Sequence, residues 1–112
     1  MDKKKTLVIG MSAISLRHIM ILKKRGYKKI FLISKHASPN KLYKIISLKN
    51  AKKKKFDFIF ICCAANERIN YLIKLKENGK KFFLEKPISD KFKNLKKMGI
   101  NSNLKKKIYV GY

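Results

Sequence analysis

The stretch Phe82-Phe83-Leu84-Glu85-Lys86-Pro87-Ile88-Ser89 ends a short apolar run with a charged pair and a proline. The composition of residues 81–84 predicts a buried strand. Pro87 cannot donate to a β-ladder, and it forces Lys86 into an extended conformation. A lysine is therefore held at the carboxyl end of a strand, where open α/β sheets bind their ligands. We expect the chemistry of this chain to lie near Lys86.

Apolar runs with strand composition recur along the chain, separated by residues at helical spacing. The strands are predicted at residues 6–9, 29–34, 58–62, 81–85 and 107–110. The helices are predicted from Ala13 to Arg25 with a stop at Gly26, from Ser38-Pro39 to about Leu48, from Asn66 to Gly79, and from Ser89 or Asp90 to Gly99. This alternation predicts one doubly wound parallel α/β domain of the Rossmann type over residues 1–112, with about five strands. The connection between the second and third strands is too short for a further strand.

The chain carries 30 lysines and arginines against 6 acidic residues, a net charge of +24. This charge has two interpretations. The protein binds an anionic partner, or the lysines simply form a solvated surface. We favour the second, because specific phosphate or base recognition usually recruits arginine. Lysine clusters directly precede each predicted strand. Since all strands of a parallel sheet start at one edge, we expect the most positive face there, opposite the ligand site.

Cys62 and Cys63 are the only cysteines. A disulfide between neighbours is strained, and no other cysteine or histidine pair has zinc spacing. We therefore expect reduced thiols, no metal site and a cytoplasmic protein. No apolar run reaches the roughly 18 residues of a membrane helix.

The turn from Gly10 to Ser15 stands where a dinucleotide-binding turn belongs, between the first strand and the first helix. Glycine is usual at its first, third and sixth places, but here Ser12 and Ser15 replace the later two. The helix N-terminus still offers N–H groups to a pyrophosphate. We expect that contact at Gly10, Met11, Ser12, Ala13 and Ile14.

The end of the second strand usually carries an acidic residue that binds the ribose hydroxyls. Here Ser34 stands in that region and Lys35 follows it. A hydroxyl beside a cation suits a 2′-phosphate, so NADP is preferred over NAD. An ordinary surface lysine is the equal alternative for Lys35.

These features together resemble the N-terminal domain of the glucose–fructose oxidoreductase, inositol dehydrogenase and MocA (Gfo/Idh/MocA) family. The resemblance covers nearly the whole chain, and Glu85-Lys86-Pro87 after a strand is its most specific part. It also rests on residues 8–18, Phe58-Ile59-Phe60-Ile61-Cys62, Gly79-Lys80-Lys81 and Val110-Gly111-Tyr112.

The resemblance implies an NAD(P)-dependent oxidoreductase acting on a sugar-like or polyol substrate. It implies that Lys86 contacts cofactor and substrate and assists proton transfer. The other cofactor contacts that it implies are Cys63, Ala64, Asn66 and Glu85.

The chain also departs from the family. Ala64 and Arg68 stand where the family has a proline and, four residues later, a histidine. In the family a second domain supplies further catalytic residues, and we expect this chain to be a truncated member without that domain. We therefore expect no activity from this domain alone, and a second domain, a subunit in trans or a homo-oligomer as partner.

Two other protein classes share some of these features. A response-regulator receiver domain is rejected, because Gly10-Met11-Ser12 and Cys62-Cys63 replace its carboxylates. A basic nucleic-acid-binding module without catalysis stays as the alternative, although no recognised motif supports it. The rings expected to be partly exposed are Tyr27, Tyr43, Tyr71 and Tyr109.

Overall fold

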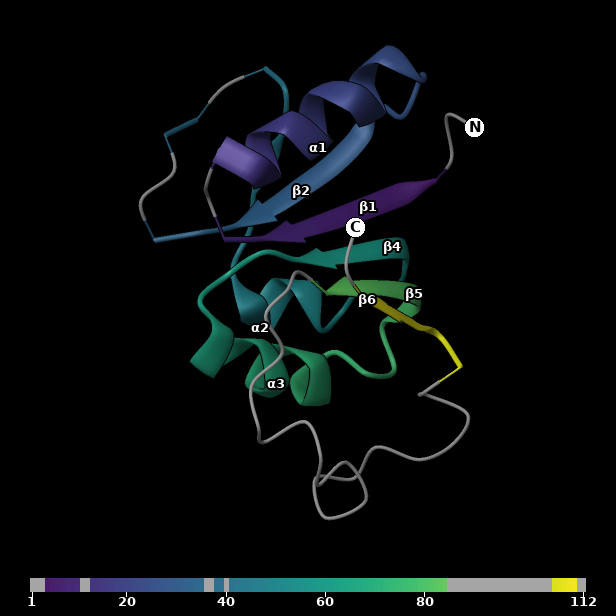
Figure 1. Ribbon diagram of the computed structural model, residues 1–112. Coiled ribbons are helices and arrows are strands. Elements are labelled where there is room, and N and C mark those ends of the chain that lie inside the picture. The colour runs from purple at the N-terminus through teal and green to yellow at the C-terminus, as the bar shows by residue number, and fades with distance from the viewer. Residues whose placement is uncertain (1–3, 11–12, 36–37, 40, 85–105, 111–112) are drawn as a thin grey trace.

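Within the described part of the chain, six parallel strands form one sheet in the order β3-β2-β1-β4-β5-β6 (Figure 1). The computed structural model describes residues 4–10, 13–35, 38–39, 41–84 and 106–110. The strands are β1 (Lys5–Ile9), β2 (Lys29–Ile33), β3 (Lys44–Ile45), β4 (Phe56–Ile61), β5 (Gly79–Leu84) and β6 (Ile108–Val110). Their parallel pairing confirms the predicted doubly wound α/β fold. The helix predicted from Ser89 or Asp90 to Gly99 lies outside the described residues.

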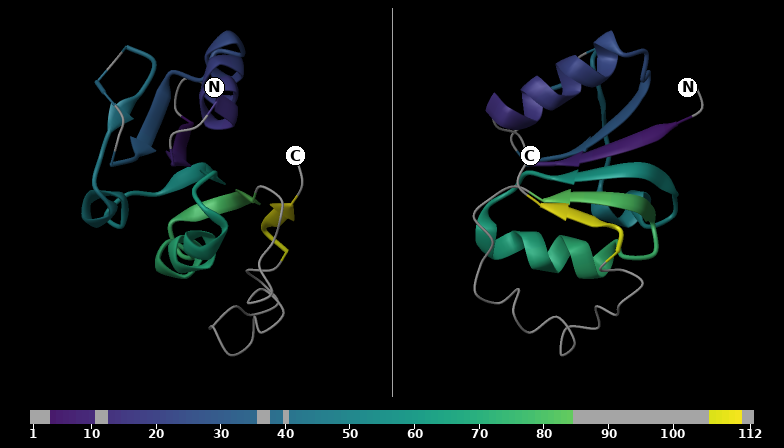
Figure 2. Two further views of the ribbon diagram at one scale, coloured as in Figure 1. Left: turned by 60° about the vertical axis from the view of Figure 1, so that its left-hand side comes forward. Right: turned by 45° about the vertical axis from the view of Figure 1, so that its right-hand side comes forward.

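Helices cover both faces of this sheet (Figure 2). They are α1 (Ala13–Lys24) on one side, and α2 (Leu48–Ala51) and α3 (Ala65–Lys74) on the other. The core accordingly has two layers. Leu7 packs with Leu72 of α3 in one layer, whereas its neighbour Val8 packs with Ile19 of α1 in the other. Successive strand residues point to opposite faces, so strands buried on both sides are continuously apolar.

The first helix ends at a glycine, as the sequence predicts. Gly26 has a φ of 89°, in the left-handed region. The N–H of Tyr27 donates to the carbonyl of Leu22 at 3.0 Å, and the N–H of Gly26 donates to that of Lys23 at 3.1 Å. This pair of hydrogen bonds is a Schellman motif, and it satisfies carbonyls that the helix end would leave without donors.

A short edge strand replaces the predicted helix from Ser38 to Leu48. Lys44 and Ile45 form β3 and pair with β2, so the expectation that a further strand has no room is wrong. The apolar spacing of Leu42, Ile45 and Ile46 imitates a helix face, but the side chain of Ile45 is 37% exposed. Pairing with the neighbouring strand has overridden the local helical pattern.

Tyr43 anchors this connection in the core. Its ring is buried, and its hydroxyl donates to the carbonyl of Ser38 at 2.6 Å. The expectation that Tyr43 is partly exposed is therefore wrong. Only after β3 does a helix begin: the hydroxyl of Ser47 accepts the N–H of Asn50 at 3.1 Å and caps α2.

The third helix differs from its prediction at both ends. Its N-cap is Ala64 and no side chain caps it, so the prediction that Asn66 does so is wrong. The helix ends at Lys74, and Gly79 is the first residue of β5 rather than a helix stop. Between them, the buried Asn78 donates to two carbonyls of the turn after α2, at 2.9 and 2.8 Å.

Lysines gather where the strands begin. Lys5 of β1 pairs with Lys29 of β2, and Lys55 directly precedes β4. Lys80 is the second residue of β5, and Lys107 directly precedes β6. Because the strands are parallel, these lysines share the amino edge of the sheet, as predicted from their positions. That this face carries the highest positive potential stays a prediction.

Candidate cofactor-binding site

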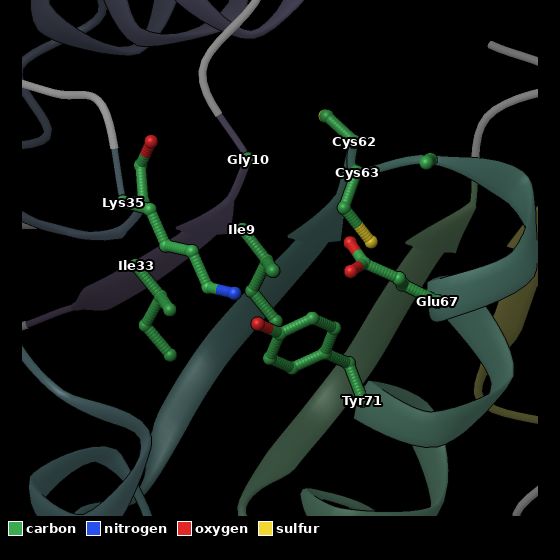
Figure 3. A pocket seen from close by; sticks show the side chains of 10 residues that line it. Ile9, Gly10, Ile33, Lys35, Cys62, Cys63, Glu67 and Tyr71 are labelled. Atoms are coloured by element: carbon green, nitrogen blue, oxygen red, sulfur yellow. The ribbon is translucent and has the colours of Figure 1, made fainter.

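A hollow of about 500 Å³ lies at the opposite, carboxyl edge of the sheet (Figure 3). Here the strand order reverses, since the chain moves outward from β1 to β2 and β3 and then returns to β4 beside β1. Open α/β sheets bind ligands at such a switch point. The lining residues are Ile9, Gly10, Ile33, Ser34, Lys35, Cys62, Cys63, Ala64, Glu67 and Tyr71.

The turn after β1 packs closely against the turn after β4. Gly10 has a φ of 93°, and its N–H donates to the carbonyl of Ile33 at 2.8 Å. A β-carbon on Gly10 would lie 2.8 Å from both the backbone nitrogen and the α-carbon of Cys63. Both the conformation and the space therefore require glycine at this position.

The end of β2 brings a hydroxyl and a cation to the same hollow. Ser34 and Lys35 directly follow the last residue of this strand. Figure 3 shows the Lys35 side chain extending across the hollow, with its amino group toward the hydroxyl of Tyr71. The hollow thus has a basic group at its β2 side and an aromatic ring opposite.

Arg68 fixes the turn that follows β4. Its Nε donates to the carbonyl oxygen of Cys63 at 2.9 Å. Arg68 stands at the place where the Gfo/Idh/MocA pattern has a histidine. In this chain, its side chain holds the backbone of the lining residues Cys63 and Ala64 from the first turns of α3.

Cys63 is a neutral thiol at physiological pH. Burial raises its pKa to about 11, and the carboxylate of Glu67, toward which its sulfur points in Figure 3, adds to the rise. The pKa of Tyr71 is also raised, chiefly by burial. Since the thiolate is the reactive form, Cys63 is suited to packing against a ligand rather than to nucleophilic attack.

The structure brings together five of the residues predicted to contact a cofactor: Gly10, Ser34, Lys35, Cys63 and Ala64. Ala13 and Ile14 begin α1, and Asn66 lies in α3. The predicted residues Met11, Ser12, Glu85 and Lys86 lie outside the described residues.

Sequence reasoning missed Glu67 and Tyr71 in this hollow. Both lie in α3, three and seven positions after Ala64, so the three residues share one side of the helix. That spacing was the available signal. In the described ranges, no group of three or more metal-ligating side chains forms, and no helix is long and apolar enough to cross a bilayer.

No protein-family profile and no curated protein sequence matches this chain. Solved structures do match. Biliverdin reductase from Synechocystis sp. PCC 6803, determined with biliverdin and NADP⁺, superposes with a TM-score of 0.73 at 12% identity over 95% of this chain and 37% of its own. A protein that has been assigned as a myo-inositol dehydrogenase, from Sinorhizobium meliloti 1021, has a TM-score of 0.71 at 15% identity, over 96% of this chain and 36% of its own.

Shikimate dehydrogenase 1 from Peptoclostridium difficile matches with a TM-score of 0.68 at 15% identity, over 99% of this chain and 44% of its own. The chain thus spans less than half the length of each of these structures. The first two are Gfo/Idh/MocA-type dehydrogenases, and the matched region is their N-terminal part. This chain therefore has the fold of the N-terminal domain of Gfo/Idh/MocA-type dehydrogenases.

Proposed function

We propose that this domain binds a nicotinamide dinucleotide, NADP in preference to NAD, as part of a cytoplasmic Gfo/Idh/MocA-type oxidoreductase. The hollow at the switch point carries the proposal. It joins the glycine turn of β1, the hydroxyl and cation after β2, and the turn after β4, which are the parts that a dinucleotide site needs. Its volume of about 500 Å³ is also in the range of small-molecule sites.

The lining residues fit the groups of such a cofactor. The backbone N–H groups at the start of α1, shortly after Gly10, would bind the pyrophosphate. Ser34 and Lys35 would hold the adenosine ribose, with the ammonium of Lys35 binding a 2′-phosphate. Tyr71 offers a flat ring on which adenine can stack. Cys63 and Ala64 would then face the nicotinamide side.

Lys86 is the residue that we propose as catalytic. It follows Leu84, the last residue of β5, which pairs with Ile61 of β4 next to the hollow. A bound nicotinamide supplies the hydride chemistry. Lys86 would orient or protonate the reacting oxygen of a sugar-like or polyol substrate. We further propose that turnover needs a second, substrate-binding domain, either continuous with this one or supplied by another chain.

Calorimetric titration with adenosine fragments tests the proposal. We expect 2′,5′-ADP to bind about tenfold more tightly than 5′-AMP, the value of one charge-assisted contact. Lys35→Ala should make the two affinities equal. Lys49→Ala, at an exposed lysine of α2, is the matched control and leaves the difference intact. Lys86→Ala leaves fragment binding unchanged but weakens binding of whole NADP. If neither NADP nor NAD binds the wild type, the proposed function is wrong and only the assignment of the fold stands.

A further inference from the structure

A row of aromatic rings crosses the sheet on the side of α1. Phe60 of β4, Phe83 of β5 and Tyr109 of β6 are register partners on adjacent strands. The rings of Phe60 and Phe83 stack with centroids 4.7 Å apart, and those of Phe83 and Tyr109 stack at 5.4 Å. Phe58 extends the row, with its ring centroid 6.1 Å from that of Phe83. We call these four rings the aromatic row.

The aromatic row is not sealed into the core. Tyr109 is 46% exposed, and Phe58, Phe60 and Phe83 are only half-buried, whereas Phe82 on the opposite face is fully buried. His18 of α1 stacks on Phe60 at 5.3 Å, which marks the reach of α1 over β4. A hollow of about 220 Å³ separates helix and rings, lined by His18, Ile21, Leu22, Arg25, Tyr27, Phe58, Phe60 and Phe83.

Cations border the row on its amino side. The Nζ of Lys4 lies 5.6 Å from the ring centroid of Phe58. Arg25 is exposed and lines the hollow. Lys81 is exposed, pairs in register with Phe58, and points to the same face as Phe83 because the two are two residues apart in one strand.

The described carboxylates lie away from these cations or are already engaged. Glu67 belongs to α3 and Glu77 to the turn after it, on the other side of the sheet. Asp57 accepts a hydrogen bond from the backbone of Lys5 and lies 3.3 Å from the Nζ of Lys80. The aromatic row therefore combines partly exposed rings with positive charge that no carboxylate of the described residues neutralises.

The aromatic rings and the neighbouring positive charge together indicate which kind of partner fits this face. A second copy of the chain would bring two such cationic borders together, at a net charge of +24 each. A duplex would present phosphates but keep its base faces stacked internally. A single strand presents both, because its bases can stack on aromatic rings while its phosphates meet lysine and arginine.

We propose that the aromatic row, with Lys4, Arg25 and Lys81, is a binding face for single-stranded nucleic acid. A base stacks on the exposed ring of Tyr109, which Phe83 supports from its other face, and the nucleic-acid backbone follows the lysines toward the amino edge of the sheet. The face is separate from the cofactor hollow, which lies at the carboxyl edge. The cofactor proposal can therefore fail without affecting this one.

Fluorescence anisotropy with a labelled oligo(dT) of about 12 nucleotides, within the usual site sizes, tests the proposal. We expect Tyr109→Ser to weaken binding about 5- to 100-fold, the range for loss of one stacked base. Lys81→Glu should weaken it at least as much. Lys74→Glu, the same charge change at an exposed residue of α3 on the opposite side, should change it less than about twofold. Phe83→Leu keeps an apolar side chain in place but removes the ring that supports Tyr109, so it should weaken binding less than Tyr109→Ser does.

Two further probes make the result decisive. Inorganic polyphosphate carries charge without bases, so it should bind more weakly than the oligonucleotide at equal phosphate, and a duplex of the same length should do so as well. Circular dichroism of each variant establishes that it is folded. Equal effects of Lys81→Glu and Lys74→Glu, or equal binding of all three polyanions, would show diffuse charge attraction and overturn the proposal. So would the absence of binding at about 100 µM protein in physiological salt, since even non-specific complexes form there.

Discussion

The α-carbon of Cys63 lies 2.8 Å from the place where a β-carbon on Gly10 would stand. Because Gly10 also has a positive φ of 93°, Gly10→Ala meets two penalties at once. We expect it to lower the free energy of unfolding by about 2–4 kcal/mol, from left-handed strain together with overpacking. Urea denaturation followed by circular dichroism measures the loss.

Gly26→Ala is the matched control for that substitution. Gly26 has nearly the same φ, 89°, but nothing lies within 4 Å of an added β-carbon. Only the conformational penalty remains, so the expected loss is about 1 kcal/mol. Equal losses for the two variants would show that the contact between Gly10 and Cys63 is not tight.

The hydrogen bond from Arg68 to the carbonyl of Cys63 predicts a role for Arg68 in shaping the cofactor hollow. We expect Arg68→Ala to lower stability by about 1 kcal/mol, the usual value of such a bond, and to weaken NADP binding. Lys74→Ala, at the exposed far end of the same helix, should do neither. Urea denaturation and calorimetry measure the two effects. An unchanged affinity of Arg68→Ala for NADP would show that this hydrogen bond does not shape the cofactor hollow.

The raised pKa of Cys63, about 11, predicts slow alkylation. In a Cys62→Ala background, iodoacetamide should modify Cys63 roughly 100-fold more slowly at pH 8 than it modifies the urea-unfolded chain. Glu67→Gln should speed the reaction in the folded protein, because the Glu67 carboxylate is the second cause of the shift. Glu77→Gln, outside the hollow, should not.

The raised pKa of Cys63 also makes the stability of the protein depend on pH in a definite direction. A thiol whose pKa is higher in the folded state contributes stability that is complete below its unfolded pKa, about 8.5, and is lost as pH rises toward 11. An alkylation rate equal to that of the unfolded chain would contradict both statements.

The carboxylate of Asp57, at the amino edge of the sheet, is predicted to stabilise the protein to a degree that falls in acid. The N–H of Lys5, at 2.9 Å, holds the pKa of Asp57 below its usual range, and the nearby Lys80 and Lys4 ammonium groups reinforce this against the opposing effect of burial. With a lowered pKa, its stabilisation is complete above about pH 4 and lost as pH falls further.

Asp57→Asn should therefore destabilise the protein by about 1 kcal/mol near neutral pH and by less in acid. Lys80→Met should cost less, because the backbone hydrogen bond from Lys5 is the larger cause and Lys80 is largely exposed. Urea denaturation near pH 7 and near pH 3 provides the comparison. A larger loss from Lys80→Met would contradict this ranking.

The sequence was sufficient for the parts of the fold in which local pattern and burial agree. Residues 6–9 are buried on both faces of the sheet, and Gly26 stops α1 through its own backbone. The segment around Tyr43 could not be predicted in the same way. Its local pattern favours a helix, but the pairing of Lys44 and Ile45 with β2 depends on a strand a dozen residues earlier.

The candidate site shows the same division. Gly10, Ser34, Lys35, Cys63 and Ala64 could be placed together because each follows a strand of one parallel sheet. The importance of Arg68 could not be read, since its bond runs to a backbone carbonyl that no sequence pattern marks. Nor could the exposure of Phe83 and Tyr109, because an aromatic strand residue is equally typical of a core.

The two-residue strand β3 has a consequence for association between chains. Lys44 and Ile45 are both exposed, and they close the side of the sheet next to β2. A long outer strand would offer an unbroken row of backbone donors and acceptors to strands of other molecules, which is how edge-to-edge aggregation starts. Two residues, one of them a lysine, offer too short and too charged a template. In a chain this rich in aromatic and isoleucine strands, that brevity protects this edge of the sheet from pairing with strands of other molecules.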